Sequence, residues 1–274
     1  IGECPTARRY RPPVQVRLMR IAIEHQIVHR PRARGSGVAQ MLRLTPDNSD
    51  EQTVAHWRID VDCDARMRAG RDGFGNAVTM LYIEEPVETV TITATGDILT
   101  SDAHGIVRGT HETLPPALYL RGTSATPATG AISAFSAEAV RDCDGPLAVL
   151  HSLNAAIHRR FAIDHDSGVD AAALLGEAKS GPCDLAHLFC TGARSLGLPA
   201  RFVSGFVAQE DAARPHCWAE AYVEGIGWLG FDPAIGLSPT DTHVRVAVAL
   251  DAAGAVPIAG EAWSDMVSLT DATQ

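Results

Sequence analysis

Alternating apolar and polar residues dominate the first third of the chain. The clearest run covers residues 20–28, and a period of two is typical of a strand with one buried face. A turn cluster at residues 72–76, Asp-Gly-Phe-Gly-Asn, separates two further strand-like runs. Because no helical stretch comes between these runs, the pattern predicts an antiparallel sandwich or half-barrel. The expected strands cover residues 20–28, 38–44, 56–61, 78–83 and 87–95.

The pattern changes after a loop-like stretch at residues 100–130 that is rich in Pro and Gly. Apolar residues then recur at helical spacing, and strand-like runs return after Pro199. Helices followed by an antiparallel series of strands predict an α+β fold. The expected helices cover residues 135–140, 147–161, 169–178 and 183–196, and the expected strands cover residues 200–207, 216–223, 228–231 and 243–250.

These patterns divide the chain into two domains. We expect a β-rich, sandwich-like domain at residues 19–125 and an α+β core at residues 131–274. Residues 1–18 are rich in Pro and Arg and have no periodicity, so we predict an extra, disordered segment there. Met19 opens the first strand-like run, and we take it as a hypothetical native start.

Composition and charge exclude several classes of protein. Of the 274 residues, 46% are hydrophobic, and the formal net charge is −10. An acidic surface argues against nucleic acid and against anionic membranes as partners. No apolar run reaches the roughly 18 residues that a membrane span requires. None of the six cysteines forms a C-x-x-C pair, so we expect free thiols in a reducing, cytoplasmic compartment.

Three residues suggest thiol chemistry. Cys183 follows Gly181-Pro182 at the start of an expected helix, where the N-terminal N–H groups favour a thiolate and an oxyanion. His216 heads a strand-like run, and Asp232 ends another. Each has a plain structural alternative: a buried cysteine, a surface histidine and a turn aspartate. Together, in this order, they provide a nucleophile, a base and a group that orients the base.

The motifs around these residues resemble those of the bacterial transglutaminase-like (papain-like cysteine protease) superfamily. They are Gly181-Pro182-Cys183-Asp184-Leu185-Ala186-His187, residues 194–205, His216-Cys217-Trp218-Ala219-Glu220, and residues 227–233. Residues 42–46 and 72–76 resemble the β-rich domain that precedes the core in this family.

The resemblance implies a core in which the helix that carries the cysteine packs on an antiparallel sheet. It implies Cys183 as nucleophile, His216 as base and Asp232 as orienting group, supported by Trp218, His187 and Asp184. The implied reaction forms an acyl-enzyme from a peptide or protein amide, followed by hydrolysis or by transfer to an amine. The resemblance implies neither a metal nor an organic cofactor. The oligomeric state stays open, a homo-oligomer included.

The chain departs from the family in two places. The family has Cys-x-Asp-x-Ala-His, whereas only Asp184 separates Cys183 from Leu185 here. In a helix, a shift of one residue turns a side chain by about 100°, unless a looser first turn absorbs it. The alternative function is therefore an inactive fold that binds proteins. Residues 249–253 also replace the family's Gly-Arg-Asp-Tyr-like segment. We expect Cys190 and Cys217 to be core residues, with Cys217 facing away from His216.

Overall fold

Two β-sheets form the N-terminal part of the protein. The computed structural model describes residues 18–30, 38–165, 174–209, 212–259 and 267–271. One antiparallel sheet has the strand order β14-β1-β6-β3, and the other has the order β2-β5-β4. The first sheet contains β1 (Leu18–His29), β3 (Gln52–Val61), β6 (Val90–Ser101) and β14 (Val267–Asp271). The second contains β2 (Val38–Leu42), β4 (Arg66–Arg71) and β5 (Ala77–Ile83).

Apolar residues from both sheets pack into one cluster. Buried and half-buried residues alternate along the whole of β6, as the period of two predicts. Ile27 and Ile92 of the first sheet pack in the same cluster as Leu42, Leu81 and Ile83 of the second. The predicted sandwich-like N-terminal region is therefore confirmed.

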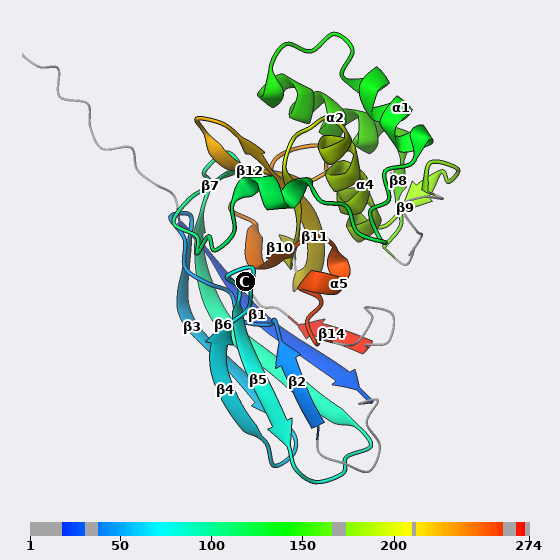
Figure 1. Ribbon diagram of the computed structural model, residues 1–274. Helices are drawn as coiled ribbons and strands as arrows, with labels where there is room; N and C mark the ends of the chain where they lie inside the picture. The colour runs from blue at the N-terminus through cyan, green and yellow to red at the C-terminus, as the bar shows by residue number, and fades with distance from the viewer. Residues whose placement is uncertain (1–17, 31–37, 166–173, 210–211, 260–266, 272–274) are drawn as a thin grey trace, which may run out of the picture.

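The second part is an antiparallel sheet covered by helices on one face (Figure 1). Its strand order is β13-β10-β11-β12-β7. The sheet contains β7 (Ile106–Val107), β10 (Ala200–Gln209), β11 (Ala212–Val223), β12 (Gly227–Phe231) and β13 (His243–Ala249). The helices are α1 (Gly130–Ala139), α2 (Pro146–Arg160) and α4 (Pro182–Ser195), and α4 packs directly on β10 and β11. The predicted α+β class is confirmed.

Shorter elements complete the fold. A 3-10 helix covers Pro116–Leu120, β8 (Ala162–Ile163) pairs in parallel with β9 (Lys179–Ser180), and α5 covers Ala252–Ala255. The predicted segment 1–18 lies almost wholly outside the described residues, as does half of the predicted helix at residues 169–178. The proposed domain division stays a prediction, and two strands cross it. β7 joins the core sheet, and β14 pairs with β1 in the first sheet.

Two buried amide side chains join the N-terminal region to the core. β13 is an edge strand, so it presents backbone groups that no neighbouring strand bonds. The Asn76 side chain donates to the Val248 carbonyl and accepts from the Val248 N–H, both at 2.8 Å. Gln52 does the same at Arg245, at 2.9 and 2.8 Å. The N-terminal region therefore holds the strand that begins at His243.

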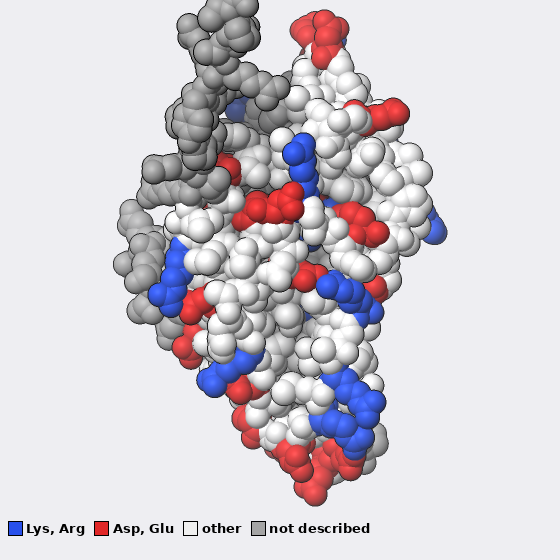
Figure 2. Space-filling model, turned by 90° about the vertical axis from the view of Figure 1, so that its left-hand side faces the viewer, with Lys and Arg blue, Asp and Glu red and all other residues white. Residues whose placement is uncertain are grey.

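Charged side chains of both signs are interspersed over the face shown in Figure 2. Pairs such as Arg58–Asp60 and Arg66–Glu84 lie on the exposed strands of the N-terminal region. None of the helices within the described residues has the length and apolar character needed to cross a bilayer.

We predict that Asn76→Ala destabilises the whole fold. The substitution leaves a buried N–H and a buried C=O of Val248 without partners, which costs about 2–4 kcal/mol. The free energy of unfolding, measured in urea, should show this loss. Asn48→Ala is the matched control, because Asn48 accepts one exposed hydrogen bond from the Val54 N–H. An equal loss in both variants would contradict the role given to Asn76.

Candidate active site

Cys183 lies in a regular first turn of α4. Gly181 is the N-cap residue, and Pro182 takes the first helical position, where an N–H would have no partner in the helix. The Leu185 N–H donates to the Gly181 carbonyl at 3.1 Å. The first turn thus closes as an ordinary α-turn, so it does not loosen to absorb the missing residue.

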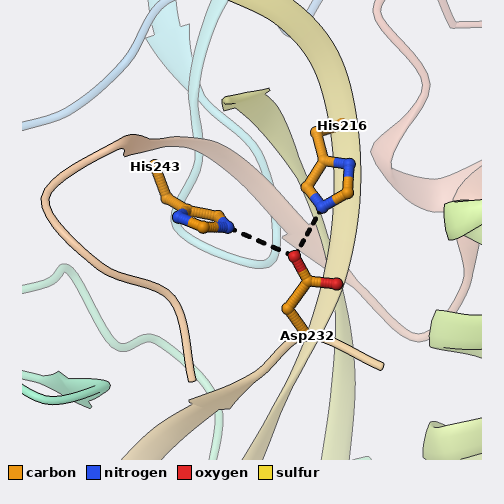
Figure 3. A group of neighbouring side chains, drawn as sticks. All are labelled: His216, Asp232 and His243. Carbon is orange, nitrogen blue, oxygen red and sulfur yellow. Dashed lines mark hydrogen bonds and ion pairs between the residues drawn. The ribbon is translucent and has the colours of Figure 1, made fainter. Parts of the chain in front are cut away.

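His216 and Asp232 come from neighbouring strands and meet in the interior (Figure 3). β11 pairs with β12 from Ala219↔Phe231 to Val223↔Gly227, so Asp232 follows β12 directly, beside the stretch that carries His216. His216 Nε2 lies 2.6 Å from Asp232 Oδ2. Asp232 Oδ1 accepts the Ala234 N–H at 2.9 Å. The carboxylate is therefore fixed on both oxygens.

His243 is a second histidine on the same carboxylate. Its Nε2 lies 3.2 Å from Asp232 Oδ2, while its Nδ1 lies 3.2 Å from the Thr240 N–H donor. Because Nδ1 accepts that bond, we assign the proton to Nε2, which donates to Asp232. The ionised carboxylate of Asp232 only accepts hydrogen bonds, so His216 also donates from Nε2, and its Nδ1, which points away from Asp232 in Figure 3, keeps a lone pair.

Asp232 is a fully buried charge. Burial raises its pKa, but the hydrogen bonds from His216 and His243 outweigh burial and hold the pKa at about 2. The carboxylate therefore stays ionised at neutral pH and can stabilise a protonated His216. This is the electrostatic role of the acid in a nucleophile–histidine–acid triad.

Trp218 supports both imidazoles. Its ring centroid lies 6.2 Å from that of His216 and 5.4 Å from that of His243. Trp218 packs in turn with Val203 and Val248. The structure thus brings this predicted supporting residue into contact with the histidine pair.

A cleft runs along the same face of β11. It is small and open to solvent, and its lining includes Trp218, Glu220, His243 and Arg245. Fully buried Glu220 pairs with Arg201 and Arg245 at 2.7 and 2.8 Å. Burial raises the pKa of Glu220, but the two guanidinium groups outweigh it and lower the pKa below its usual range. A buried group of ion pairs therefore lies behind the wall of the cleft.

Cys183 is bonded to Cys217. The Cα atoms are 4.9 Å apart, and 34 positions separate the residues in sequence. Among the described residues, no hydrogen bond joins the Cys183 sulfur to the His216 ring. The expectation of free cysteines is therefore wrong for this pair, because two cysteines far apart in sequence meet where α4 packs on β11. Cys63, Cys143 and Cys190 are free.

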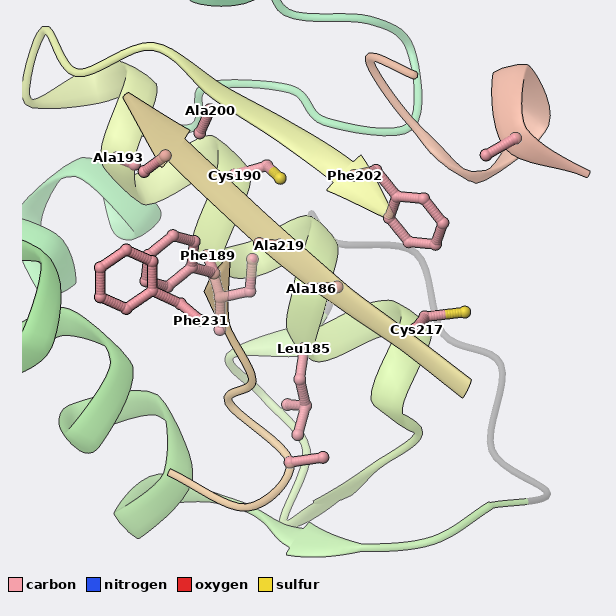
Figure 4. Packing of buried hydrophobic residues seen from close by; sticks show 14 of the residues in the cluster. Leu185, Ala186, Phe189, Cys190, Ala193, Ala200, Phe202, Cys217, Ala219 and Phe231 are labelled. Carbon is pink, nitrogen blue, oxygen red and sulfur yellow. The ribbon is translucent and has the colours of Figure 1, made fainter. Parts of the chain in front are cut away.

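The expected positions of Cys190 and Cys217 agree with the structure. Both are buried in the cluster between α4 and the sheet (Figure 4). Burial raises the pKa of Cys190 to about 11, so this thiol is unreactive. Cys217 faces α4, whereas the preceding residue, His216, stacks with Trp218. The expectation missed that Cys217 also contacts the sulfur of Cys183.

His187 and Asp184 lie on α4, and within the described residues no hydrogen bond or ring contact joins them to His216 or His243. Asp184 lies in the first turn. The His187 ring packs 4.9 Å from Phe202, and its Nε2 accepts the Ala252 N–H at 2.9 Å. Residues 249–253, which depart from the family pattern, therefore serve to anchor α5 on α4.

The same groups have the spacing of a metal site. The ligand atoms of His216, Asp232 and His243 all lie within 4.8 Å of one another, and imidazole and carboxylate are ligands of Zn²⁺. The hydrogen bonds that the two histidines make to Asp232 already explain this arrangement, since both satisfy the buried carboxylate. That no metal is needed stays a prediction.

Family models match both parts of the chain. Residues 133–233, which include Cys183, His216 and Asp232, match the transglutaminase-like superfamily. Residues 21–98 match the bacterial transglutaminase-like N-terminal region. The chain therefore belongs to the bacterial transglutaminase-like proteins.

Two relatives and one solved structure are similar to this chain over most of its length. An uncharacterised protein of Mycobacterium leprae is 26% identical over 245 residues, covering 80% of this chain and 84% of the relative. One from Mycobacterium tuberculosis is 27% identical and covers 86% of each chain. A candidate cysteine protease from Cytophaga hutchinsonii superposes with a TM-score of 0.71 at 17% identity, covering 94% of this chain and 89% of that chain. This likeness shows a shared fold.

Two residues of the site escaped the sequence reasoning. His243 stands at the head of a predicted strand, as His216 does, and this repeated position was the available signal. Cys217 gave no comparable signal, because nothing in its spacing from Cys183 predicts contact. Both become visible only when α4, β11 and β13 are assembled.

We predict that Asp232 makes stability depend on pH in the acid range. Its folded pKa of about 2 lies below the usual value of 3.8, so its contribution is complete above about pH 4. The contribution is lost as pH falls toward 2, and amounts to about 2 kcal/mol. The free energy of unfolding, measured in urea, should fall over this pH range by more for the wild type than for Asp232→Asn. Asp97→Asn, which removes an exposed partner of Arg20, should leave the wild-type slope unchanged.

Proposed function

We propose that the protein, once its active-site cysteine is reduced, is a thiol enzyme that cleaves or transfers peptide or side-chain amide bonds. Cys183 is the nucleophile, His216 the base and Asp232 the group that orients it. The observation that carries the proposal is the buried 2.6 Å contact between His216 Nε2 and Asp232, which leaves Nδ1 to receive a thiol proton.

Cys183 is close enough for this role. Consecutive Cα atoms are about 3.8 Å apart and Cys183 lies 4.9 Å from Cys217, so its Cα lies within about 8.7 Å of the His216 Cα. The two side chains lie on opposite faces of β11, so the sulfur has to pass the edge of the strand to meet the imidazole. β12 pairs with β11 only from Ala219 onward, so it does not cover the edge of β11 at His216. The proposed function requires the sulfur to pass this edge from one face to the other.

The reaction follows from these positions. His216 Nδ1 takes the proton of Cys183, and the thiolate attacks the carbonyl carbon of the amide. N–H groups of the first turn of α4 stabilise the oxyanion. The imidazolium, held by Asp232, returns the proton to the leaving amine, and an acyl-enzyme remains on Cys183. Water or a second amine, deprotonated by His216, then releases the acyl group.

The substrate proposal is a peptide or protein carboxamide bound along the cleft beside Trp218. Neither a metal nor an organic cofactor takes part. Hydrolysis and transfer share every step up to the acyl-enzyme, so access of the acceptor decides between them. Mass spectrometry of peptide products with and without an added primary amine distinguishes the two.

The second candidate function is an inactive, protein-binding member of the family. The regular first turn of α4 favours it, because Pro182 stands where the family spacing from His187 would place the cysteine. In that case reduction would release an ordinary thiol that does not respond to His216. The two candidates therefore predict different thiol reactivity.

We predict that reduced Cys183 reacts with iodoacetamide as a thiolate well below the usual cysteine pKa of about 8.5. His216→Ala should slow this labelling at neutral pH by about tenfold, because the thiolate loses its cationic partner. Peptide mass spectrometry across pH reports Cys183 separately from Cys63 and Cys143. Labelling of Cys183 that matches these two thiols and ignores His216 would favour the binding function.

We predict that His243→Ala lowers kcat about tenfold and changes KM little. Removing one of the two imidazole donors to buried Asp232 weakens its hold on His216, and hydrogen bonds to charged groups contribute about 1.5–3 kcal/mol. His243→Gln can still donate and should restore part of the rate. A shift of the pH–rate profile in His243→Ala separates this positioning role from simple loss of stability. His151→Ala, which removes a ring that packs on Phe231 away from the carboxylate, is the control.

A further inference from the structure

The sulfur that the proposed function requires as nucleophile is oxidised in this structure. Cys183 is bonded to Cys217, which immediately follows the proposed base. A sulfur in a disulfide has no proton to give and no lone pair activated by His216. The amide chemistry therefore cannot start from this state.

We propose that the Cys183–Cys217 disulfide is a reversible redox site whose reduction by a dithiol switches the enzyme on. This proposal rests on the proposed function, since it regulates the same nucleophile. It adds a second class of reactant, a dithiol reductant, and assigns a role to Cys217, which the amide reaction does not use.

The two sulfurs differ in a way that sets the direction of attack. Cys183 is half-buried in the first turn of α4, whereas Cys217 is only 2% exposed. A reductant therefore reaches Cys183 first. Its position at a helix N-terminus also stabilises the thiolate that reduction produces.

The exchange balances as a two-electron reduction. A thiolate of the reductant attacks Cys183 Sγ, the Cys183–Cys217 bond breaks, and Cys217 leaves as a thiolate that takes a proton. The second thiol of the reductant, once deprotonated, attacks its own sulfur in the mixed disulfide and releases Cys183 as a thiolate. The reductant ends as a disulfide, and the protein ends with two thiol groups.

Packing around the bond supports a reversible role. α4 already contacts β11 through buried Leu185, Ala186 and Phe189, which share a cluster with Ala219 and Phe231. Figure 4 shows these residues between the helix and the strand, with Cys217 at the end of the row. The helix therefore keeps its place when the bond opens. The freed sulfur then has to pass the edge of β11 to reach His216, which lies on the other face of the strand.

The test compares oxidised and reduced wild-type protein with Cys217→Ala. Cys63 and Cys143 are blocked first, and dithiothreitol then serves as the dithiol. Two readouts are taken on each sample: iodoacetamide labelling of the Cys183 peptide and hydrolysis of a peptide amide. In the wild type both should rise at least tenfold on reduction and fall again on reoxidation. Cys217→Ala should show high values without any reductant.

Matched variants keep the test independent of folding. Cys143→Ala removes a half-buried free thiol and should respond to dithiothreitol like the wild type. Cys217→Ser, checked by circular dichroism, replaces Cys217→Ala if the latter does not fold, and the wild-type cycle requires no substitution. Equal labelling and turnover in oxidised and reduced wild type would overturn the redox proposal, as would a Cys217→Ala protein that still needs reductant.

The two readouts separate the redox proposal from the proposed function. Labelling that depends on reductant, without turnover in any sample, supports the redox site and contradicts the amide chemistry. Turnover that ignores the redox state contradicts the redox site and supports the amide chemistry.

Discussion

The site depends on one buried negative charge, the carboxylate of Asp232. A carboxylate without solvent is stable only when donors satisfy it, and here two imidazoles and one backbone N–H do so. His216 comes from β11 and His243 from β13, on either side of β10 in the sheet. The charge therefore requires three strands to keep their register. It also fixes which nitrogen of His216 faces outward, and this gives the proposed base a defined orientation.

The N-terminal sandwich takes part in this arrangement. β13 is an edge strand, and its backbone is completed by side chains of Gln52 and Asn76 instead of by another strand. These two amides hold Arg245 and Val248, and so the strand that begins at His243. Arg245 in turn pairs with Glu220 on β11, two residues beyond Trp218. Loss of the sandwich would therefore disturb Asp232 through β13, although none of the residues described in the sandwich bonds the carboxylate. These hydrogen bonds physically link the two regions.

Cys183, the proposed nucleophile, obeys a different constraint, the register of a helix. Pro182 and Gly181 start α4 in the ordinary way, and a regular helix fixes the direction in which Cys183 leaves the axis. That direction leads to Cys217 on the helix-facing side of β11, whereas His216 projects on the side of Trp218. Successive residues of a strand point to opposite faces, so the sulfur and the base begin on different sides. A disulfide at this point is compatible with a reversible change of state, because the apolar contact of α4 with the sheet lies beside it.

The sequence by itself determined the α+β class, most strands and helices, and the identity of His216 and Asp232 as a pair at adjacent strand ends. It did so because these features depend on local properties of the chain: the period of its apolar residues, the positions of Gly and Pro, and the spacing within motifs. Trp218 followed from the same motif. Tertiary structure alone decided the partner of Cys183, the second imidazole on Asp232, the anchoring of His187 by Ala252, and the return of β14 to the first sheet. These are contacts between elements far apart in the chain, and their geometry depends on helix register and strand pairing, which no local pattern records.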